Sequence, residues 1–340
     1  MYKYKQIIFF ILWAFIAQAQ NLHTPTEVQN IIGKSQRVYV FDTLINTPKA
    51  EIHPIITKES QFSIKLQENS VDLPTFKLAR KERKKLKKAN NDFATGKLQK
   101  ALENYIKIYH STQAIVLHPR LAYCYEKLGQ LEQALLYYNK IVPTAQSDAD
   151  IHYTIARINY ELSNKETALH HIHLAHLFDR NNSAYLDAMI QYYNDKGAQY
   201  RKWTFDPIYQ LEASADSSHI HIKSQASPWE AYAACKAIWV FEPGYKKQMK
   251  FLSSVDVSII EEKECLLNAL INFENMVDSK DQYPLLTVLK KALSEKRIDD
   301  YILYEISARK YPSIIRQLSA KRLEQLVDYI VTYRIMQPVN

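Results

Sequence analysis

The spacing of glycine constrains the fold of this chain more than any other feature of its sequence. The 340 residues include only five glycines, and Gly96, Gly129 and Gly197 are separated by 33 and then 68 residues. The second interval is twice 34, and its midpoint falls at Ser163 and Asn164, residue types that also occur in tight turns. A period of 33–34 residues with helical spacing on both sides of each turn predicts a stacked array of helix–turn–helix units.

The residues after each turn repeat as well. Ala-Leu occupies the fifth and sixth positions after the turn residue in the segments 96–102, 129–135 and 163–169. This pattern resembles the tetratricopeptide repeat family, in which one repeat is a pair of antiparallel helices with small residues where they cross. The small positions of the family match Ala89, Ala122 and Ala156 on the first helices and Ala101, Ala134 and Ala168 on the second helices. Alanine permits close helix contact, and a turn glycine permits positive φ.

The resemblance covers about a third of the chain and implies three repeats plus a half. The larger packing positions match Tyr105, Ile108, Tyr138, Ile141, Ile172 and Ala175. The closing proline of the family is absent, and the fourth unit has a first helix over about 183–196 but Lys202 where alanine is expected. The resemblance thus implies an all-α protein: a tetratricopeptide-like α-α superhelix, followed by a C-terminal helical bundle or by degenerate repeats.

The first residues are typical of a secretory signal peptide. Lys3 and Lys5 precede an apolar run over 7–17, and Ala17-Gln-Ala19 is a small-x-small cleavage site that leaves Gln20 as the mature start. A membrane anchor is the alternative, but the run is short for spanning a bilayer. The sequence therefore predicts a signal peptide over 1–19 and an exported protein, periplasmic or extracellular, of the bacterial type in this family.

Four further regions follow. Residues 20–76 are predicted to be an extended leader with little regular structure, apart from a short helix near 28–32 and β-type composition over 37–44. This leader either packs along the array, adds a small strand pair, or is disordered. Residues 77–202 form the repeats, and 203–227 form a linker loop with at most a short hairpin. Residues 228–340 form a helical region, either a separate domain or a continuation of the superhelix.

The resemblance also implies a binding face, because tetratricopeptide arrays usually bind partners on the concave face that the first helices line. Carried over position by position, the groove residues are Asn90, Phe93, Tyr123, Glu126, Lys127, Tyr153, Arg157, Tyr160, Gln191 and Asn194. Tyrosine rings beside arginine and amide groups are typical of a peptide-binding surface. The alternatives are an ordinary wet surface or a groove filled by the leader. Only Asn90 fits the family's clamp for a C-terminal carboxylate, so that ligand is not predicted.

Basic residues are concentrated in one run. The formal net charge is +8, and residues 77–88 contain eight basic residues and one acidic residue. Export argues against a nucleic-acid partner. The run is interpreted as the solvated face of the first repeat helix; the alternative is contact with an anionic lipid, an envelope glycolipid or an acidic partner through Lys81, Arg83 and Lys84.

The remaining polar clusters do not form a recognisable catalytic or metal site. The chain has no phosphate-binding glycine loop, no nucleophile elbow and no metalloprotease helix. The histidines His170, His171, His173 and His176 do not form an i,i+4 pair, and they are predicted to be solvated on the outer face. Neither a metal nor a cofactor is predicted. Whether Cys235 and Cys265 pair stays open.

The predicted function is a non-enzymatic, exported scaffold that binds a segment of another protein in the concave groove and helps to assemble an envelope or surface complex. One alternative is an enzyme in which Glu261 and Cys265 act with His219 or His221 while the repeats bind the substrate. Another is a binder of anionic envelope glycolipid. The sequence does not identify the partner or the oligomeric state.

Overall fold

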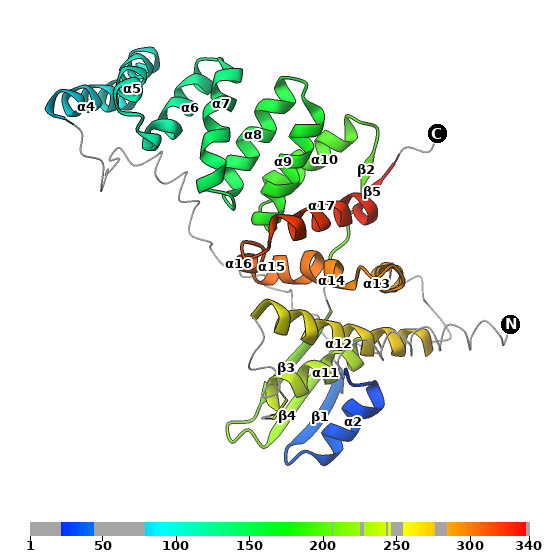
Figure 1. Cartoon of the computed structure of the whole chain (residues 1–340). Helices are drawn as coiled ribbons and strands as arrows, with labels where there is room; N and C mark the ends of the chain where they lie inside the picture. Colours follow the sequence, from blue (N-terminus) through cyan, green and yellow to red (C-terminus); the bar gives the residue numbers. More distant parts are fainter. Residues whose placement is uncertain are drawn as a thin grey trace. The chain divides into compact units, whose positions relative to one another are not determined.

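The computed structural model describes residues 22–43, 79–205, 207–224, 228–242, 244–245, 254–275 and 284–337. The chain divides into two compact units. The sheet unit combines Met1–Ile52 with Lys202–Ser307, and the array unit combines His53–Arg201 with Ala308–Asn340. The described residues are mostly helical, which confirms the predicted class at the coarse level (Figure 1). The predicted signal peptide lies outside the described residues.

Helix pairs form the array unit (Figure 1). The pairs are α4 (Arg80–Ala94) with α5 (Leu98–Thr112), α6 (His118–Lys127) with α7 (Leu131–Ile141), and α8 (Ala149–Glu161) with α9 (Lys165–Phe178). The short helices η1 (Ile115–Leu117) and η2 (Val142–Thr144) connect successive pairs, and α10 (Ser183–Asn194) follows α9. The small residues predicted at the helix crossings, from Ala89 to Ala168, are all fully buried.

The turns inside the pairs share one backbone geometry. Gly96, Gly129 and Gly197 have φ of +73°, +74° and +76°, and Ser163 has φ of +62°. In each turn the next amide donates to the carbonyl five residues earlier: Lys97 to Asp92, Gln130 to Tyr125, Asn164 to Asn159 and Ala198 to Tyr193, at 2.8–3.0 Å. This bond satisfies a carbonyl that the ending helix leaves free. Ser163 therefore occupies the missing glycine position in the same conformation.

The far end of the array is covered by the last part of the chain. This closing segment contains α15 (Ala308–Lys310), α16 (Pro312–Ile315), α17 (Ala320–Arg334) and β5 (Ile335–Met336). Both α16 and α17 pack against α9, and β5 pairs antiparallel with β2 (Gln199–Tyr200). The predicted single region 228–340 is therefore divided, because its last residues complete the array unit and the rest belongs to the sheet unit.

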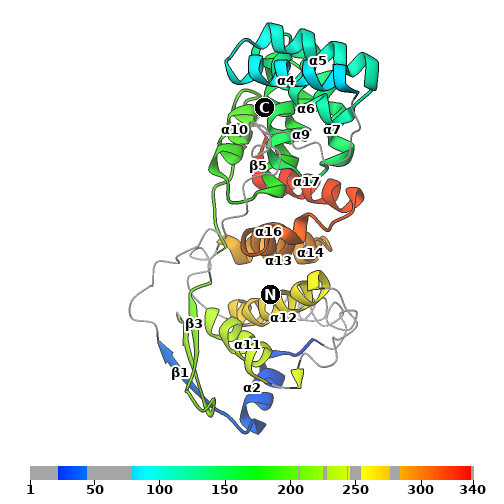
Figure 2. The ribbon, with the colours of Figure 1, turned by 90° about the vertical axis from the view of Figure 1, so that its left-hand side faces the viewer.

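The sheet unit contains a three-stranded sheet in the order β1-β4-β3, with β1 (Val38–Thr43) parallel to β4 (His219–Ser224) and β3 (Tyr209–Ala213) antiparallel to β4. Helix α11 (Trp229–Phe241) packs on this sheet, and Ile220 and Ile222 meet Ala233 and Ala237. Helices α2 (Pro25–Lys34) and α12 (Ser254–Asn275) also contact α11 (Figure 2). Helices α13 (Pro284–Ser294) and α14 (Ile298–Tyr301) and the π-helix η5 (Ile302–Ser307) complete the unit.

The short hairpin allowed for within 203–227 is present as β3 and β4, but the segment is more than a linker, because β4 is the central strand of the three-stranded sheet. The alternation of His219, Ile220, His221 and Ile222 places both isoleucines on the face buried by α11.

Residues 22–43 contain the helix and the strand that their sequence indicated, but they are part of the sheet unit and not a leader with little regular structure. Helix α2 begins at a capping box formed by Thr24 and Glu27, and β1 joins the sheet. The Tyr39 hydroxyl donates to Glu242 at 2.6 Å, which ties β1 to the end of α11. Residues 44–76 lie outside the described residues. Among the described helices, none is both long and apolar enough to cross a membrane.

Candidate binding face on the helical array

The predicted groove residues contact one another from one helix pair to the next. On each first helix, the residue three positions before the turn residue contacts a residue of the next first helix, which lies six positions before its own turn residue in the first two cases. Phe93 packs on Tyr123 with ring centroids 5.3 Å apart, and the Arg157 guanidinium donates to Glu126 at 2.5 Å. Tyr160, the next residue in this series, stacks on Tyr192 at 4.0 Å. We call this series of contacts across α4, α6, α8 and α10 the first-helix ladder.

Buried tyrosines on the second helices donate hydrogen bonds to ladder residues on the first helices. The Tyr105 hydroxyl donates to Asn90 Oδ1 at 2.8 Å, and the Tyr138 hydroxyl donates to Glu126 at 2.5 Å. Burial raises the pKa of both phenols, and for Tyr138 the Glu126 carboxylate raises the pKa further. Both hydroxyls are therefore protonated donors at neutral pH, which fixes the orientation of the acceptors on the first helices.

Charge on the ladder is largely compensated. Arg157 binds Glu161 within α8 at 2.7 Å as well as Glu126 on α6. The Glu126 side chain is only 10% exposed, so its bonds with Arg157 and Tyr138 are shielded from water. Lys127 lies 3.9 Å from Glu126 and also stands over the Tyr123 ring at 5.4 Å. The centre of the face is thus a prepacked polar and aromatic surface.

The rest of the face lies between α8 and α10. Tyr153 packs on Tyr185 with ring centroids 5.1 Å apart, and the Tyr185 hydroxyl donates to Asp150. Burial and, to a smaller extent, the electrostatic interaction with Tyr153 raise the pKa of the Tyr192 phenol to about 12. The Tyr160 hydroxyl donates to Asp195.

The predicted residues differ in how much they can offer a partner. Asn90, Phe93, Tyr123, Glu126, Tyr153, Arg157 and Tyr160 are half-buried, whereas Lys127, Gln191 and Asn194 are exposed. The structure brings the first group together in the ladder and leaves the second group facing water.

Sequence reasoning missed several members of the face. Arg120 stands over the Phe93 ring at 4.3 Å, and Tyr185, Tyr192 and Asp195 contact the predicted tyrosines. The family pattern marks fixed positions in each repeat, and these residues lie beside those positions. The density of tyrosine on α10 was the signal that could have found Tyr185 and Tyr192.

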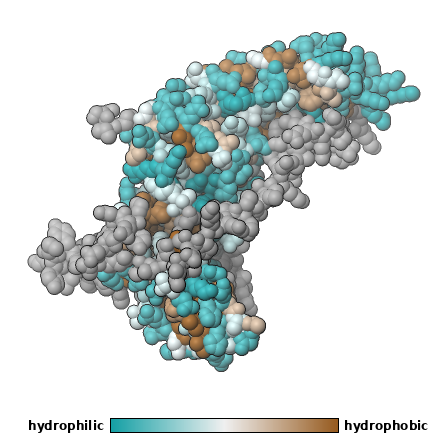
Figure 3. All heavy atoms as spheres, turned by 180° about the vertical axis from the view of Figure 1, so that it is seen from behind, coloured by the Kyte–Doolittle hydropathy of each residue, from teal (hydrophilic) through white to brown (hydrophobic). Residues whose placement is uncertain are grey.

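The predicted basic surface lies on α4, in the first helix pair of the array. Lys81, Arg83 and Lys84 are exposed on α4, while Leu86 and Ala89 on the same helix are buried. Hydrophilic side chains cover this end of the molecule in the view of Figure 3.

Two of the four histidines of α9 are buried, contrary to the prediction, whereas the His170 side chain is 43% exposed. His173 is buried against α10, where its Nε2 lies 3.0 Å from the Tyr193 hydroxyl, and His176 is buried on a helix that α16 and α17 of the closing segment also contact. His171 Nδ1 lies 2.9 Å from His152 Nδ1, and His152 Nε2 lies 2.9 Å from the Gln146 carbonyl. A carbonyl only accepts, so His152 carries its proton on Nε2 and His171 donates. The described residues contain no cluster of three or more potential ligands that could hold a metal ion.

The residues named for the alternative enzyme are not brought together: Glu261 and Cys265 lie on α12, whereas His219 is exposed on β4 and the His221 side chain is 40% exposed on the same strand. Lys236 binds Glu261 at 2.8 Å and Glu262 at 2.7 Å, and Cys265 is fully buried. Burial raises the pKa of the Cys265 thiol, which is the opposite of what activates a nucleophile. Cys235 and Cys265 are close enough for a thiol–thiol hydrogen bond, and both are free thiols.

Comparison with known proteins does not assign the chain to a family. No protein-family model matches the sequence, and no curated protein is significantly similar to it.

Proposed function

We propose that this protein is an exported, non-enzymatic scaffold of the tetratricopeptide type, which binds a segment of a partner protein on the face carrying the first-helix ladder. The observation that carries the proposal is the ladder itself. Its aromatic and charged contacts, Phe93 with Tyr123 and Glu126 with Arg157, join successive first helices into one preorganised surface. A rigid surface loses little conformational freedom on binding, which favours affinity.

The chemistry of this face suits a segment that is polar and carries at least one acidic side chain. Lys127 supplies an exposed cation beside the Tyr123 ring, and the exposed amides of Gln191 and Asn194 can donate to and accept from a peptide backbone. The half-buried rings of Tyr153 and Tyr160 supply flat area between these groups. Export, and a role in assembling an envelope or surface complex, are part of the same proposal and rest on the signal sequence.

Crosslinked co-purification from the native cell envelope tests the proposal. The informative variant replaces only exposed groups of the face: Lys127, Gln191 and Asn194, each by alanine. The matched control replaces Gln133 and Asn139, exposed on the second helix α7, by alanine. We expect the first variant to lose the crosslinked partner, with unchanged helicity by circular dichroism, and the control to retain it. Equal capture by both variants would refute the proposal.

A second candidate is an anionic surface as the partner, which the exposed basic residues of α4 favour. Sedimentation with vesicles of anionic phospholipid, compared with neutral vesicles, tests it. Replacement of Lys81, Arg83 and Lys84 by glutamine should abolish a salt-sensitive association. Association that persists in that variant, or that does not weaken with salt, would exclude this candidate.

A further inference from the structure

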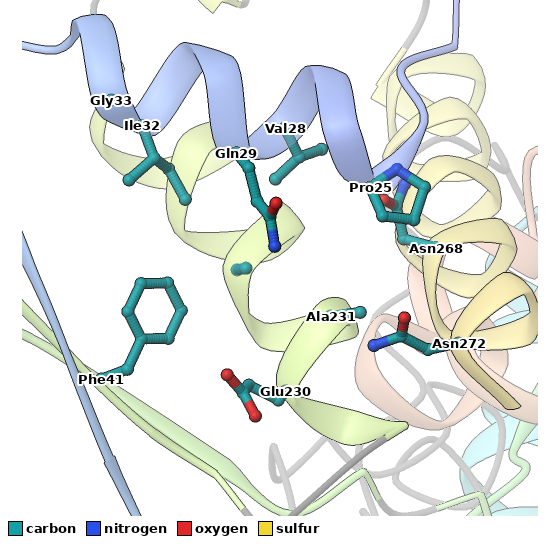
Figure 4. A pocket seen from close by; sticks show the side chains of 11 residues that line it. Pro25, Val28, Gln29, Ile32, Gly33, Phe41, Glu230, Ala231, Asn268 and Asn272 are labelled. Carbon is teal, nitrogen blue, oxygen red and sulfur yellow. The ribbon is translucent and has the colours of Figure 1, made fainter. Parts of the chain in front are cut away.

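A cavity of about 490 Å³ lies in the sheet unit (Figure 4). Its walls come from α2, β1, α11 and α12. The N-terminal helix and strand therefore build one side of this cavity. This size is within the range of roughly 300–1,000 Å³ that is common for small-molecule sites.

The larger part of the wall is apolar. Val28 and Ile32 project from α2, Phe41 projects from β1 toward them, and Ala231 lies on α11 (Figure 4). Ala234 of α11 also lines the cavity. The small side chains of Ala231 and Ala234 keep the cavity open, because a larger residue at either position would fill it. Phe41 is 43% exposed, so a ligand in the cavity would bury aromatic surface that water now contacts.

The polar part of the wall is mostly made of acceptors and amides. Among the described residues of the lining, Glu230 is the only ionisable one; it is exposed, and its carboxylate points toward Phe41 (Figure 4). Asn272 presents a half-buried amide from α12. Because the described lining carries a carboxylate and no basic side chain, a cationic group is favoured over an anionic one.

Asn268 marks the inner end of the cavity. Its side-chain amide donates to the His23 carbonyl and to the Glu264 carbonyl, both at 2.9 Å, so it fixes the start of α2 on α12. Its Oδ1 atom is buried and accepts no hydrogen bond from the described residues. A buried acceptor without a donor costs free energy that a donor on a ligand could recover after a small shift of α2.

We propose that this cavity binds a small apolar amine, with its apolar group between Phe41, Val28 and Ile32 and its ammonium group at Glu230, where the amide of Asn272 supplies a second acceptor. The proposal is independent of the function proposed for the array, because every residue that carries it belongs to the sheet unit.

The test uses 2-phenylethylamine as the probe and phenylacetate, which has a ring of the same size and the opposite charge, as its counterpart. Binding to the mature chain is followed by saturation-transfer NMR and titration calorimetry. We expect the amine to bind and phenylacetate to bind more weakly. Equal binding of the two compounds, or no binding of the amine, would overturn the proposal.

Two variants locate the site. Glu230→Gln should weaken the amine roughly threefold, the size expected for a solvent-exposed ion pair, and should leave phenylacetate unaffected or improved. Glu132→Gln, which removes an exposed carboxylate from α7 in the array unit, is the control with the same charge change. Ala231→Phe should fill the cavity and abolish binding. Tryptophan fluorescence verifies that the variants are folded, because Trp229 and Trp239 are buried beside this site on α11. Amine binding that survives in the folded Ala231→Phe variant would place the amine elsewhere and refute the assignment.

Discussion

Buried histidines should make the array unit sensitive to mild acid. Burial lowers the pKa of His171 to about 3 and that of His173 to about 4, and it also lowers the pKa of His152 and, strongly, that of His176. The unfolded chain takes up these protons near the ordinary pKa of about 6.5, whereas the folded array does not. The contribution of these groups to stability is therefore complete above pH 6.5 and is lost as the pH falls toward the folded-state values.

The magnitude follows from linkage. A pKa of about 4 in the folded state and about 6.5 in the unfolded state means that His173 costs about 2 kcal/mol of stability between pH 7 and pH 5. His171 gives a similar loss if it titrates independently, so the two together remove about 4 kcal/mol, a large part of the roughly 5–15 kcal/mol that stabilises a typical domain. Protonation of His152 would also replace an acceptor with a donor opposite His171 and break that hydrogen bond.

Urea unfolding of the protein at pH 7 and pH 5 measures this effect. The two units can be observed separately, because Trp203, Trp229 and Trp239 lie in the sheet unit and the segments 79–201 and 308–340 contain no tryptophan. Circular dichroism at 222 nm follows all helices, while tryptophan fluorescence follows the sheet unit alone.

The matched variants are His173→Gln and His170→Gln, on the same helix; the His170 side chain is 43% exposed. We expect His173→Gln to reduce the loss on acidification by about 2 kcal/mol and His170→Gln to leave it unchanged. An array transition that does not move between pH 7 and pH 5, or that moves equally in both variants, would refute the reasoning.

Four other predictions concern the turns and the buried polar groups. Gly129→Ala should destabilise the array by about 1 kcal/mol in urea unfolding, because alanine is strained at a φ of +74°; an added Cβ meets no atom within 4 Å, so no steric clash adds to this cost. Ser163→Gly should stabilise the array by about 0.5 kcal/mol, because glycine relieves the strain of the left-handed conformation by more than it adds to the entropy of the unfolded chain. Lys236→Met should lower the stability of the sheet unit by about 3 kcal/mol, seen as an earlier fluorescence transition, because the buried Glu262 carboxylate loses its cation; an unchanged midpoint would contradict this. The Cys265 thiol should react with a thiol reagent only at the rate of unfolding, because it is fully buried and its pKa is raised, and rapid labelling of the folded chain would show that this interior opens.

The turns of the array could be predicted from the sequence because they depend on local conformation. A residue in left-handed conformation leaves a signature in the chain itself, which is why the intervals between glycines located Gly96, Gly129 and Gly197 and also the substitute Ser163. A turn with the same hydrogen bond occurs in the sheet unit at Lys296, where the Arg297 amide donates to the Ala292 carbonyl. No glycine marks that turn, so the spacing of glycines could not reveal it.

The errors concern elements whose partners are distant in sequence. His176 was expected on an outer face, but it lies near Arg334 of the closing segment, which begins more than 130 residues later. Phe41 and Ile222 lie opposite each other in adjacent strands, but neither stretch has a local pattern that specifies the other. For the candidate site, the family positions found the ladder residues, whereas the pairing of Glu126 with Arg157 required the orientation of two neighbouring helices.

The position of the N-terminal segment in the sheet unit has a consequence for biogenesis. The His23 amide donates a hydrogen bond to Glu264, 241 residues later in the chain, and β1 pairs only with β4 among the described strands. The strands cannot pair until most of the polypeptide has been synthesised, and the array cannot be closed until its last helix has emerged. The sheet unit needs residues up to Ser307 and the array unit needs the closing segment, so neither unit can be completed from the first half of the chain. Loss of even the last thirty or so residues should therefore leave a product that quality-control proteases remove.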